Sequence, residues 1–120
     1  MPFSYEINRW RRLVIARFHG VTDDEELMGY YERLRHDPSF DPRYWELVDL
    51  RDVDRFETAG VTIEAVARLR VFHANVRRAA IAPTDLAFGL ARIFAAYAEC
   101  HGQEVEVFRD ASDADEWLAR

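Results

Sequence analysis

The chain of 120 residues has no lysine, one cysteine and no long apolar run, and each of these absences excludes a class of protein. A Walker-type phosphate-binding loop needs a lysine, so this kind of nucleotide site is excluded. The single cysteine, Cys100, has no partner for an internal disulfide. No stretch approaches the roughly 18 consecutive apolar residues that span a bilayer, so an integral membrane protein is not expected.

Acidic residues outnumber basic ones. All 16 basic residues are arginine, 22 residues are acidic, and the formal net charge is -6. Proteins that bind the phosphate backbone of nucleic acids normally carry the opposite charge, so no nucleic-acid partner is expected. The hydrophobic fraction of 49% and the charged fraction of 32% are typical of a folded globular chain, which we assign to one domain over residues 1–120. Nothing at the N-terminus resembles a signal sequence, which predicts a cytoplasmic location.

Motifs for metal binding and nucleophilic catalysis are also missing. The four histidines are scattered, with none of the H-x-x-x-H or C-x-x-C spacings that place two ligands on one metal ion. Cys100 and His101 are neighbours, but a nucleophile and its base need a third, orienting group, and no flanking signature indicates one. We therefore predict no metal, no cofactor and no catalytic residue, and expect a protein that is not an enzyme.

Hydrophobic periodicity and capping residues predict nine elements of secondary structure. Gly20 is expected to end the second strand, and Thr22 to cap the first helix through a capping box. Thr58 or Thr62 is expected to cap the second helix, and Thr84 the third. In order, the predicted elements are strands 3–7 and 13–18, a helix from 22 to about 35, strand 45–53, helix 61–76, strand 79–83, helix 84–99, strand 104–109 and helix 112–118.

The order β-β-α-β-α-β-α-β-α predicts an α/β fold in a single domain. Strands that alternate with helices after an opening hairpin imply a mixed, mostly parallel sheet with right-handed crossovers, covered by helices. Arg77 and Arg78 are expected to close the helix 61–76. The short apolar run that follows, Ala79 to Pro83, is expected to be a buried strand in the middle of the sheet.

The helix 84–99 has two apolar stripes. The main stripe, which is expected to face the sheet, consists of Leu86, Leu90, Ile93, Phe94 and Tyr97. A narrower strip on the other side consists of Phe88, Ala91 and Ala95. A helix that covers one face of a sheet does not require this second strip, so it is a candidate face for forming a homodimer.

Aromatic residues on two predicted helices leave two interpretations open. The residues Tyr30, Tyr31, Phe94 and Tyr97 follow a helical spacing, which is typical of core positions. The same side chains can instead line a small apolar pocket between the sheet and the helices. In that case the protein binds a small apolar or lipid-like ligand.

The stretch ELVDLRDVDRFETAG, residues 46–60, concentrates acidic residues at a strand end. Strand alternation places Leu47, Asp49, Arg51 and Val53 on one face and Glu46, Val48, Leu50 and Asp52 on the other. Asp49 and Asp52 therefore diverge unless the strand bends between them, and Asp49 is expected to pair with Arg51 or with arginines elsewhere. Open α/β sheets bind ligands and partners where a parallel strand leads into a helix. The predicted contact site consists of Asp49, Arg51, Asp52, Thr58 and Gly60.

A resemblance to a known family covers nearly the whole chain. LVDLRDVDRFETAGVTIEAV resembles the strand, turn and helix of STAS domains, the class of the anti-sigma-factor antagonists. Together with EINRWRRLVIARFHG, FDPRYWELVDLRDV and APTDLAFGLARIF, it makes the chain similar to the SpoIIAA-like branch of small bacterial STAS/SEC14-type proteins. The resemblance implies helices mainly on one face of the sheet and a non-enzymatic regulatory domain. The partner would be another protein or a second copy of the chain.

One position departs from the STAS pattern. In phosphorylated STAS proteins the serine immediately before the turn glycine accepts the phosphate, whereas Ala59 stands here. Thr58, one place earlier, is the only candidate phosphoacceptor in the turn, and its expected role is that of a turn or cap residue.

Overall fold

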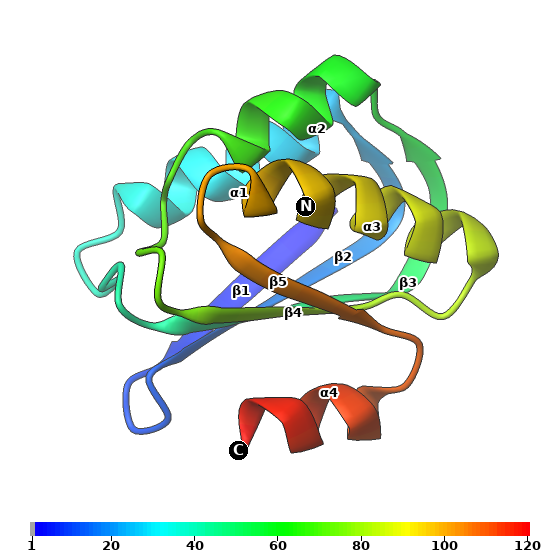
Figure 1. Cartoon of the computed structure of the whole chain (residues 1–120). Helices are drawn as coiled ribbons and strands as arrows, with labels where there is room; N and C mark the ends of the chain where they lie inside the picture. Colours follow the sequence, from blue (N-terminus) through cyan, green and yellow to red (C-terminus); the bar gives the residue numbers. More distant parts are fainter. Residues whose placement is uncertain (1) are drawn as a thin grey trace.

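The computed structural model describes residues 2–120, in which five strands form one sheet in the order β1-β2-β3-β4-β5 (Figure 1). β1 is antiparallel to β2, and every later pair of neighbours is parallel. The predicted α/β class, the order of elements and the mixed, mostly parallel sheet are confirmed. The elements are β1 (Phe3–Asn8), β2 (Leu13–Asp23), α1 (Asp24–Arg35), β3 (Trp45–Glu57), α2 (Gly60–Ala67), β4 (Arg77–Ile81), α3 (Asp85–Glu99), β5 (Glu104–Phe108) and α4 (Ala111–Leu118).

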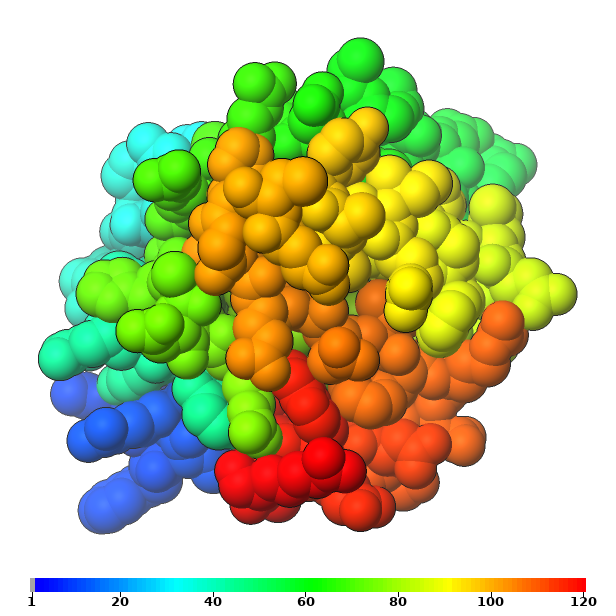
Figure 2. Space-filling model, viewed as in Figure 1, coloured from blue at the N-terminus to red at the C-terminus, as the bar shows by residue number. Residues whose placement is uncertain are grey.

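The strand order decides where the helices lie. From β2 to β5 each new strand is added, parallel, to the same edge of the growing sheet. Because each crossover is right-handed, all three connecting helices lie on the same face. Figure 1 shows α1, α2 and α3 together on one face and α4 alone on the other. In the space-filling view the green and gold helical segments pack against each other above the sheet, with α4 in red below it (Figure 2). The sheet is thus covered on both faces.

Each face of the sheet has its own apolar cluster. The face under α1 to α3 buries large aromatic side chains, among them Phe18, Tyr30 and Phe72. The face under α4 buries smaller side chains of β3 and β4 against Ala114 and Leu118. Consecutive strand residues point to opposite faces, so the interior strands are apolar on both.

The second strand is longer than predicted. Gly20 has a positive φ of 67° but does not end β2, which continues beside β3 as far as Asp23. Thr22 is therefore a buried strand residue and not the cap of α1. The cap is Asp23, whose side chain accepts a hydrogen bond from the backbone N–H of Glu26 at 2.9 Å. Pairing with the equally extended β3 overrides the local capping signal.

The second helix is shorter than predicted. α2 ends at Ala67, and its N-cap is Ala59, so the prediction of Thr58 or Thr62 as cap is wrong. The segment after α2 is irregular, yet it buries Phe72 and Val76 in the core, which explains the helix-like spacing of apolar residues in the sequence. Arg77 and Arg78 begin β4 instead of ending a helix.

Candidate functional site

A cavity of about 90 Å³ lies between the sheet and the three helices of one face. Residues of β2, β3 and β4 line its floor, and residues of α1, α2 and α3 line its walls. Most of the lining is apolar; its side chains include Phe18, Leu27, Val48, Leu50, Phe56, Ile63, Leu90, Ala91 and Phe94. The cavity lies where the sequence places an apolar pocket.

Two of the four aromatic residues predicted to line the pocket do so. Tyr31 and Phe94 line the cavity with their rings stacked at a centroid distance of 6.2 Å and an interplanar angle of 8°. Tyr30 is fully buried in the core behind the cavity, where it packs edge-on against Phe18. Tyr97 packs in a neighbouring apolar cluster and is not among the lining residues. The prediction is therefore wrong for Tyr30 and Tyr97.

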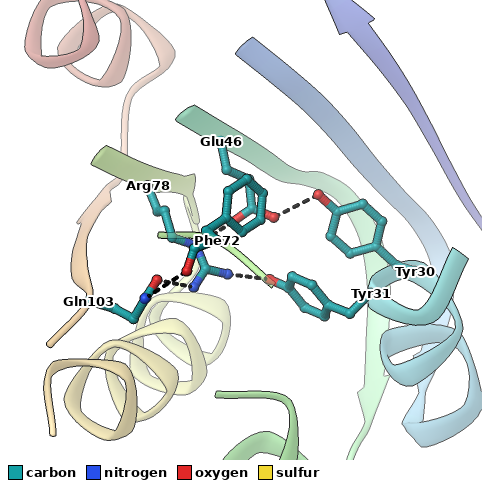
Figure 3. A network of polar contacts seen from close by, with 6 residues as sticks. All are labelled: Tyr30, Tyr31, Glu46, Phe72, Arg78 and Gln103. Atoms are coloured by element: carbon teal, nitrogen blue, oxygen red, sulfur yellow. Dashed lines mark hydrogen bonds and ion pairs between the residues drawn. The ribbon is translucent and has the colours of Figure 1, made fainter. Parts of the chain in front are cut away.

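The floor of the cavity contains a buried ion pair. Arg78 on β4 donates from Nε to Oε1 of Glu46 on β3 at 2.9 Å, and both side chains are at most 5% exposed. Arg78 also donates from Nη2 to the Tyr31 hydroxyl at 3.0 Å, and the Tyr30 hydroxyl donates to Oε2 of Glu46 at 2.6 Å. Figure 3 shows the four side chains converging from α1, β3 and β4. Arg78, Glu46, Tyr30 and Tyr31 form what we call the buried network.

A fifth side chain extends the buried network toward the backbone. Gln103 accepts a hydrogen bond from Nη1 of Arg78 at 3.2 Å and donates one to the carbonyl oxygen of Phe72 at 3.0 Å (Figure 3). The irregular segment after α2 is thereby tied to the start of β5. The guanidinium of Arg78 also lies over the rings of Phe72 and Phe94, at 4.7 and 5.2 Å from their centroids.

The pKa shifts follow from this packing. Burial acts to lower the pKa of Arg78, but the Glu46 carboxylate and the tyrosine hydroxyls outweigh it, and the net pKa is raised. Burial, followed by the charge of Glu46, raises the pKa of Tyr30 and Tyr31 well above the usual range. The guanidinium therefore stays charged and the tyrosines stay neutral over the physiological pH range.

Glu46 and Arg78 are not among the site residues predicted from the sequence. Glu46 shares its strand face with the apolar residues Val48 and Leu50. An acidic residue on an apolar face is expected to be buried and to need a cationic partner, and this pattern could have identified Glu46. Arg78 was assigned to a helix end, so its place on the neighbouring strand was not visible.

Thr22, predicted as a helix cap, also lines the cavity. Its side chain lies at the end of β2, and only 3% of the residue is exposed. Its hydroxyl oxygen Oγ1 has no hydrogen-bond partner among residues 2–120. A buried hydroxyl without a partner is costly, which makes Thr22 the unsatisfied polar group of the cavity.

Asp49 and Arg51 form the predicted pair. Oδ1 of Asp49 accepts from the backbone N–H and Nε of Arg51, both at 3.0 Å, and Oδ2 accepts from Nη2 at 2.7 Å. Arg17 on β2 adds a contact of 3.9 Å. Burial acts to raise the pKa of Asp49, but the Arg51 hydrogen bonds outweigh it and lower the net pKa. The Asp49 carboxylate is thus engaged in ion pairs.

The predicted contact site of residues 49–60 is divided between the two faces of the sheet. Asp49 follows Leu47 by two residues on β3, and Leu47 packs in the cluster under α4, so strand alternation places the pair of Asp49 and Arg51 on the α4 side. Thr58 instead lines the cavity on the other side. Gly60 begins α2, and Asp52 is exposed beyond the pair. The structure therefore does not gather these five residues into one site.

An irregularity in β3 explains part of this division. The register between β2 and β3 shifts after Arg17 and Asp49, and pairing resumes with His19 opposite Asp52. Beyond this shift the side chains of β3 no longer alternate between the two faces as predicted. Val53 packs against the cluster under α1 to α3 and does not share the face of Asp49. The prediction for the face of Val53 is wrong for this reason.

The helix α3 is rotated relative to the prediction. Thr84 caps it as expected, accepting from the backbone N–H of Ala87 at 3.1 Å. Leu86 and Ile93 of the predicted main stripe are 61% and 45% exposed. The predicted dimer strip points inward, since Ala95 is buried, Ala91 lines the cavity and Phe88 is half-buried under the guanidinium of Arg109. The small residues Ala87, Ala95 and Ala98 let the helix approach the sheet closely, so the strip is not an outer face.

Residues 2–120 contain no group of three or more histidine, cysteine or carboxylate side chains placed to hold a metal ion. In the same part of the chain no helix combines the length and the apolarity that crossing a membrane demands. The polar groups that face the cavity are Arg78, Glu46, the hydroxyls of Tyr31, Thr22 and Thr58, and backbone.

Comparison with known proteins supports the fold. No family model matches the sequence, and no curated protein matches it. A crystal structure of an uncharacterized protein of the DUF3478 family with a SpoIIAA-like fold, from Shewanella loihica PV-4, matches with a TM-score of 0.63 and 18% sequence identity. The match covers 97% of this chain and 93% of that one. The chain thus has a SpoIIAA-like fold, as its resemblance to the STAS class implies.

Proposed function

We propose that the protein is a non-catalytic binding module that holds a small, mainly apolar ligand between the sheet and α1, α2 and α3. The observation that carries the proposal is the apolar cavity of about 90 Å³ at the junction of two apolar clusters under α1 to α3. The cavity is partly open to solvent, so a small molecule can enter it. Apolar concave sites of this kind commonly bind ligands.

The walls of the cavity favour an apolar occupant. Aromatic and aliphatic side chains of seven elements converge on it, and its one ion pair is already matched within the protein. Ligand pockets are typically concave, apolar and supplied with a few convergent polar groups, and this cavity has each of these properties. We expect the protein to bind the ligand without changing it, as a carrier or as a sensor.

An NMR titration of the protein with toluene tests this function. Toluene should shift the resonances of Tyr31 and Phe94 in the wild-type protein and should bind reversibly. Ala91→Phe fills the cavity from α3 and should abolish the shifts, because Ala91 lines it. Ala96→Phe is the matched control, with the same change on the exposed side of the same helix, and should bind toluene as the wild type does. Equal toluene binding by both variants would contradict the proposal.

A regulatory role through protein contacts is the second candidate function. β3 pairs with β4 only as far as Asp49 opposite Ile81, but with β2 as far as Glu57. The outer half of β3 is therefore a strand edge, and it carries exposed charges of both signs, with Asp52 and Asp54 between Arg51 and Arg55. Partners commonly add a strand to such an edge. This edge fits an extended segment of another protein.

Charge reversal tests the second candidate. If a partner binds along this edge, protein purified from its own cells should retain that partner in the wild type and lose it in Asp52→Arg with Asp54→Arg. Arg43→Glu, at an exposed loop far from the edge in sequence, serves as the control. Retention of the same partners by the double variant would argue against this edge as the contact.

A further inference from the structure

We infer that the ligand of this cavity is uncharged and carries one hydrogen-bonding group, a hydroxyl or a carbonyl, which bonds to the hydroxyl of Thr22. This inference rests on the proposed binding function and narrows it to a chemical class. It is carried by three observations on the cavity, namely its size, its balance of charge and the unsatisfied hydroxyl at one end.

The size of the cavity limits the ligand. A single water needs about 10–15 Å³ of such volume, so 90 Å³ accommodates roughly six to nine non-hydrogen atoms. This is the size of a substituted benzene ring or of a short aliphatic chain. The cavity is partly open to solvent, so this limit applies to the part of the ligand that it encloses, and a two-chain lipid or a nucleotide is far too large to be enclosed.

The charges in the cavity exclude an ionised ligand. The single cation facing it is Arg78, and its charge is matched by Glu46 at 2.9 Å. Because these two charges compensate each other, no charged side chain that lines the cavity is left to compensate a carboxylate, a phosphate or an ammonium group on a ligand. Burying an unmatched charge is prohibitively costly, so the site selects uncharged molecules.

The hydroxyl of Thr22 supplies the polar contact. Thr22 lines the cavity, is 3% exposed, and its Oγ1 has no partner among residues 2–120. Leaving a buried hydroxyl unsatisfied destabilises the folded state, and a valine of nearly the same shape would avoid this cost. A hydroxyl can both donate and accept, and so it fits a ligand hydroxyl or carbonyl.

The strand register separates this hydroxyl from the ion pair. Glu46 lies opposite Val14, and Thr22 is eight residues further along β2. At about 3.3 Å per residue this separates the two backbone positions by roughly 26 Å. A ligand of the allowed size that bonds to Thr22 therefore contacts apolar side chains such as Leu27, Phe56 and Ile63, and not the ion pair.

The test pairs two matched replacements of a hydroxyl by a methyl group. Phenol and toluene differ in this way, as do Thr22 and the variant Thr22→Val. NMR titrations of both proteins with both probes yield the ratio of the phenol affinity to the toluene affinity. This ratio should fall about tenfold from the wild type to Thr22→Val, because one buried hydrogen bond is lost. Thr22→Ser, which keeps the hydroxyl, should preserve the wild-type ratio.

Benzoate tests the restriction to uncharged ligands, because it is ionised at neutral pH. It should bind the wild-type protein at least tenfold more weakly than phenol does.

The stability of the free protein is a second readout. Without ligand, Thr22→Val should raise the melting temperature, because it removes an unsatisfied hydroxyl from the core. A lower melting temperature would show that the hydroxyl serves the fold, and would overturn the inference.

The outcomes separate this inference from the proposed function. If phenol and toluene both bind but Thr22→Val leaves their affinity ratio unchanged, the role of Thr22 is wrong while the cavity remains a binding site. If benzoate binds as tightly as phenol, the restriction to uncharged ligands is wrong. If neither phenol nor toluene binds the wild-type protein, the proposed function fails together with the inference.

Discussion

Two arginine–carboxylate pairs lie on opposite faces of the same sheet at almost equal separations. Arg78 and Glu46 are 2.9 Å apart under α1 to α3, with side chains 5% and 2% exposed. Arg51 and Asp49 are 2.7 Å apart on the α4 face, where the arginine side chain is 50% exposed and the carboxylate 7%. Distance does not distinguish the two pairs, but access to water does.

The difference shows what each pair contributes. Water screens the guanidinium of Arg51 and can replace Asp49 as its partner, so this pair adds little to stability. The buried pair is shielded from bulk water, and each charge is tolerated there only because the other is present. Arg78, held by Glu46, also binds the hydroxyl of Tyr31 in the wall of the cavity. The buried pair therefore fixes the shape of the proposed binding site, whereas the outer pair orders the strand end.

The largest expected effect comes from breaking the buried pair. Arg78→Met leaves the Glu46 carboxylate buried without its cation and should lower the free energy of unfolding by about 3–5 kcal/mol, measured by urea denaturation. The double variant Arg78→Met with Glu46→Gln removes both charges and should recover most of this loss. A single variant that costs less than about 1 kcal/mol would show that the buried pair behaves like a surface pair.

The second-largest expected effect is a loss of stability at high pH, caused by the buried tyrosines. Burial and the charge of Glu46 raise the pKa of Tyr30 and Tyr31, and burial with the Asp37 hydrogen bond raises the pKa of Tyr5 to about 12. In the unfolded chain these hydroxyls ionise near 10.0, so the unfolded state loses its protons first. Stability should be intact below pH 10 and should fall as the pH rises toward and beyond 12.

Tyrosinate absorbance recorded together with circular dichroism checks this expectation. Ionisation of the buried tyrosines should coincide with loss of helical signal. Tyr30→Phe and Tyr31→Phe should each reduce the number of tyrosines that ionise in the unfolding step by one. Ionisation of these two residues near pH 10 in a folded protein would contradict their burial.

The smallest expected effect comes from the outer pair. Arg51→Ala should lower the free energy of unfolding at pH 7 by less than about 1 kcal/mol, because the arginine is half exposed. The pKa of Asp49 is lowered in the folded protein, so the stabilisation is present above 3.8 and is lost as the pH falls through the folded value. The stabilities of wild type and variant should therefore converge on acidification toward pH 2. A difference that stays constant down to pH 2 would show that the arginine acts through packing and not through charge.

The architecture was largely predictable from the sequence because it depends on local patterns. Alternating strands and helices, the hairpin at residues 8–12 and the cap at Thr84 determine the order of elements, and the preference for right-handed crossovers leads to a mostly parallel sheet. Errors arose where a distant partner overrides a local signal. Thr22 looks like a helix cap until β3 extends β2 past it, and Phe72 and Val76 look helical although an irregular segment buries them.

The candidate site was only partly predictable. Tyr31 and Phe94 follow a helical spacing that predicts interior positions and leaves both a core and a pocket open, and the structure places them in the pocket wall. Glu46 and Arg78 meet only through the register between β3 and β4, which periodicity does not reveal. The contact region 49–60 was treated as one surface, but the irregularity after Asp49 and the turn at Thr58 direct its residues to different faces.

Native mass spectrometry of protein freshly purified from its own cells tests the central claim most directly. The wild type and Ala96→Phe should carry an additional small mass that is released on denaturation. Ala91→Phe, whose new ring fills the cavity, should show the mass of the polypeptide alone. A wild-type protein of bare polypeptide mass, or an additional mass that persists in Ala91→Phe, would contradict the claim that this cavity is the binding site.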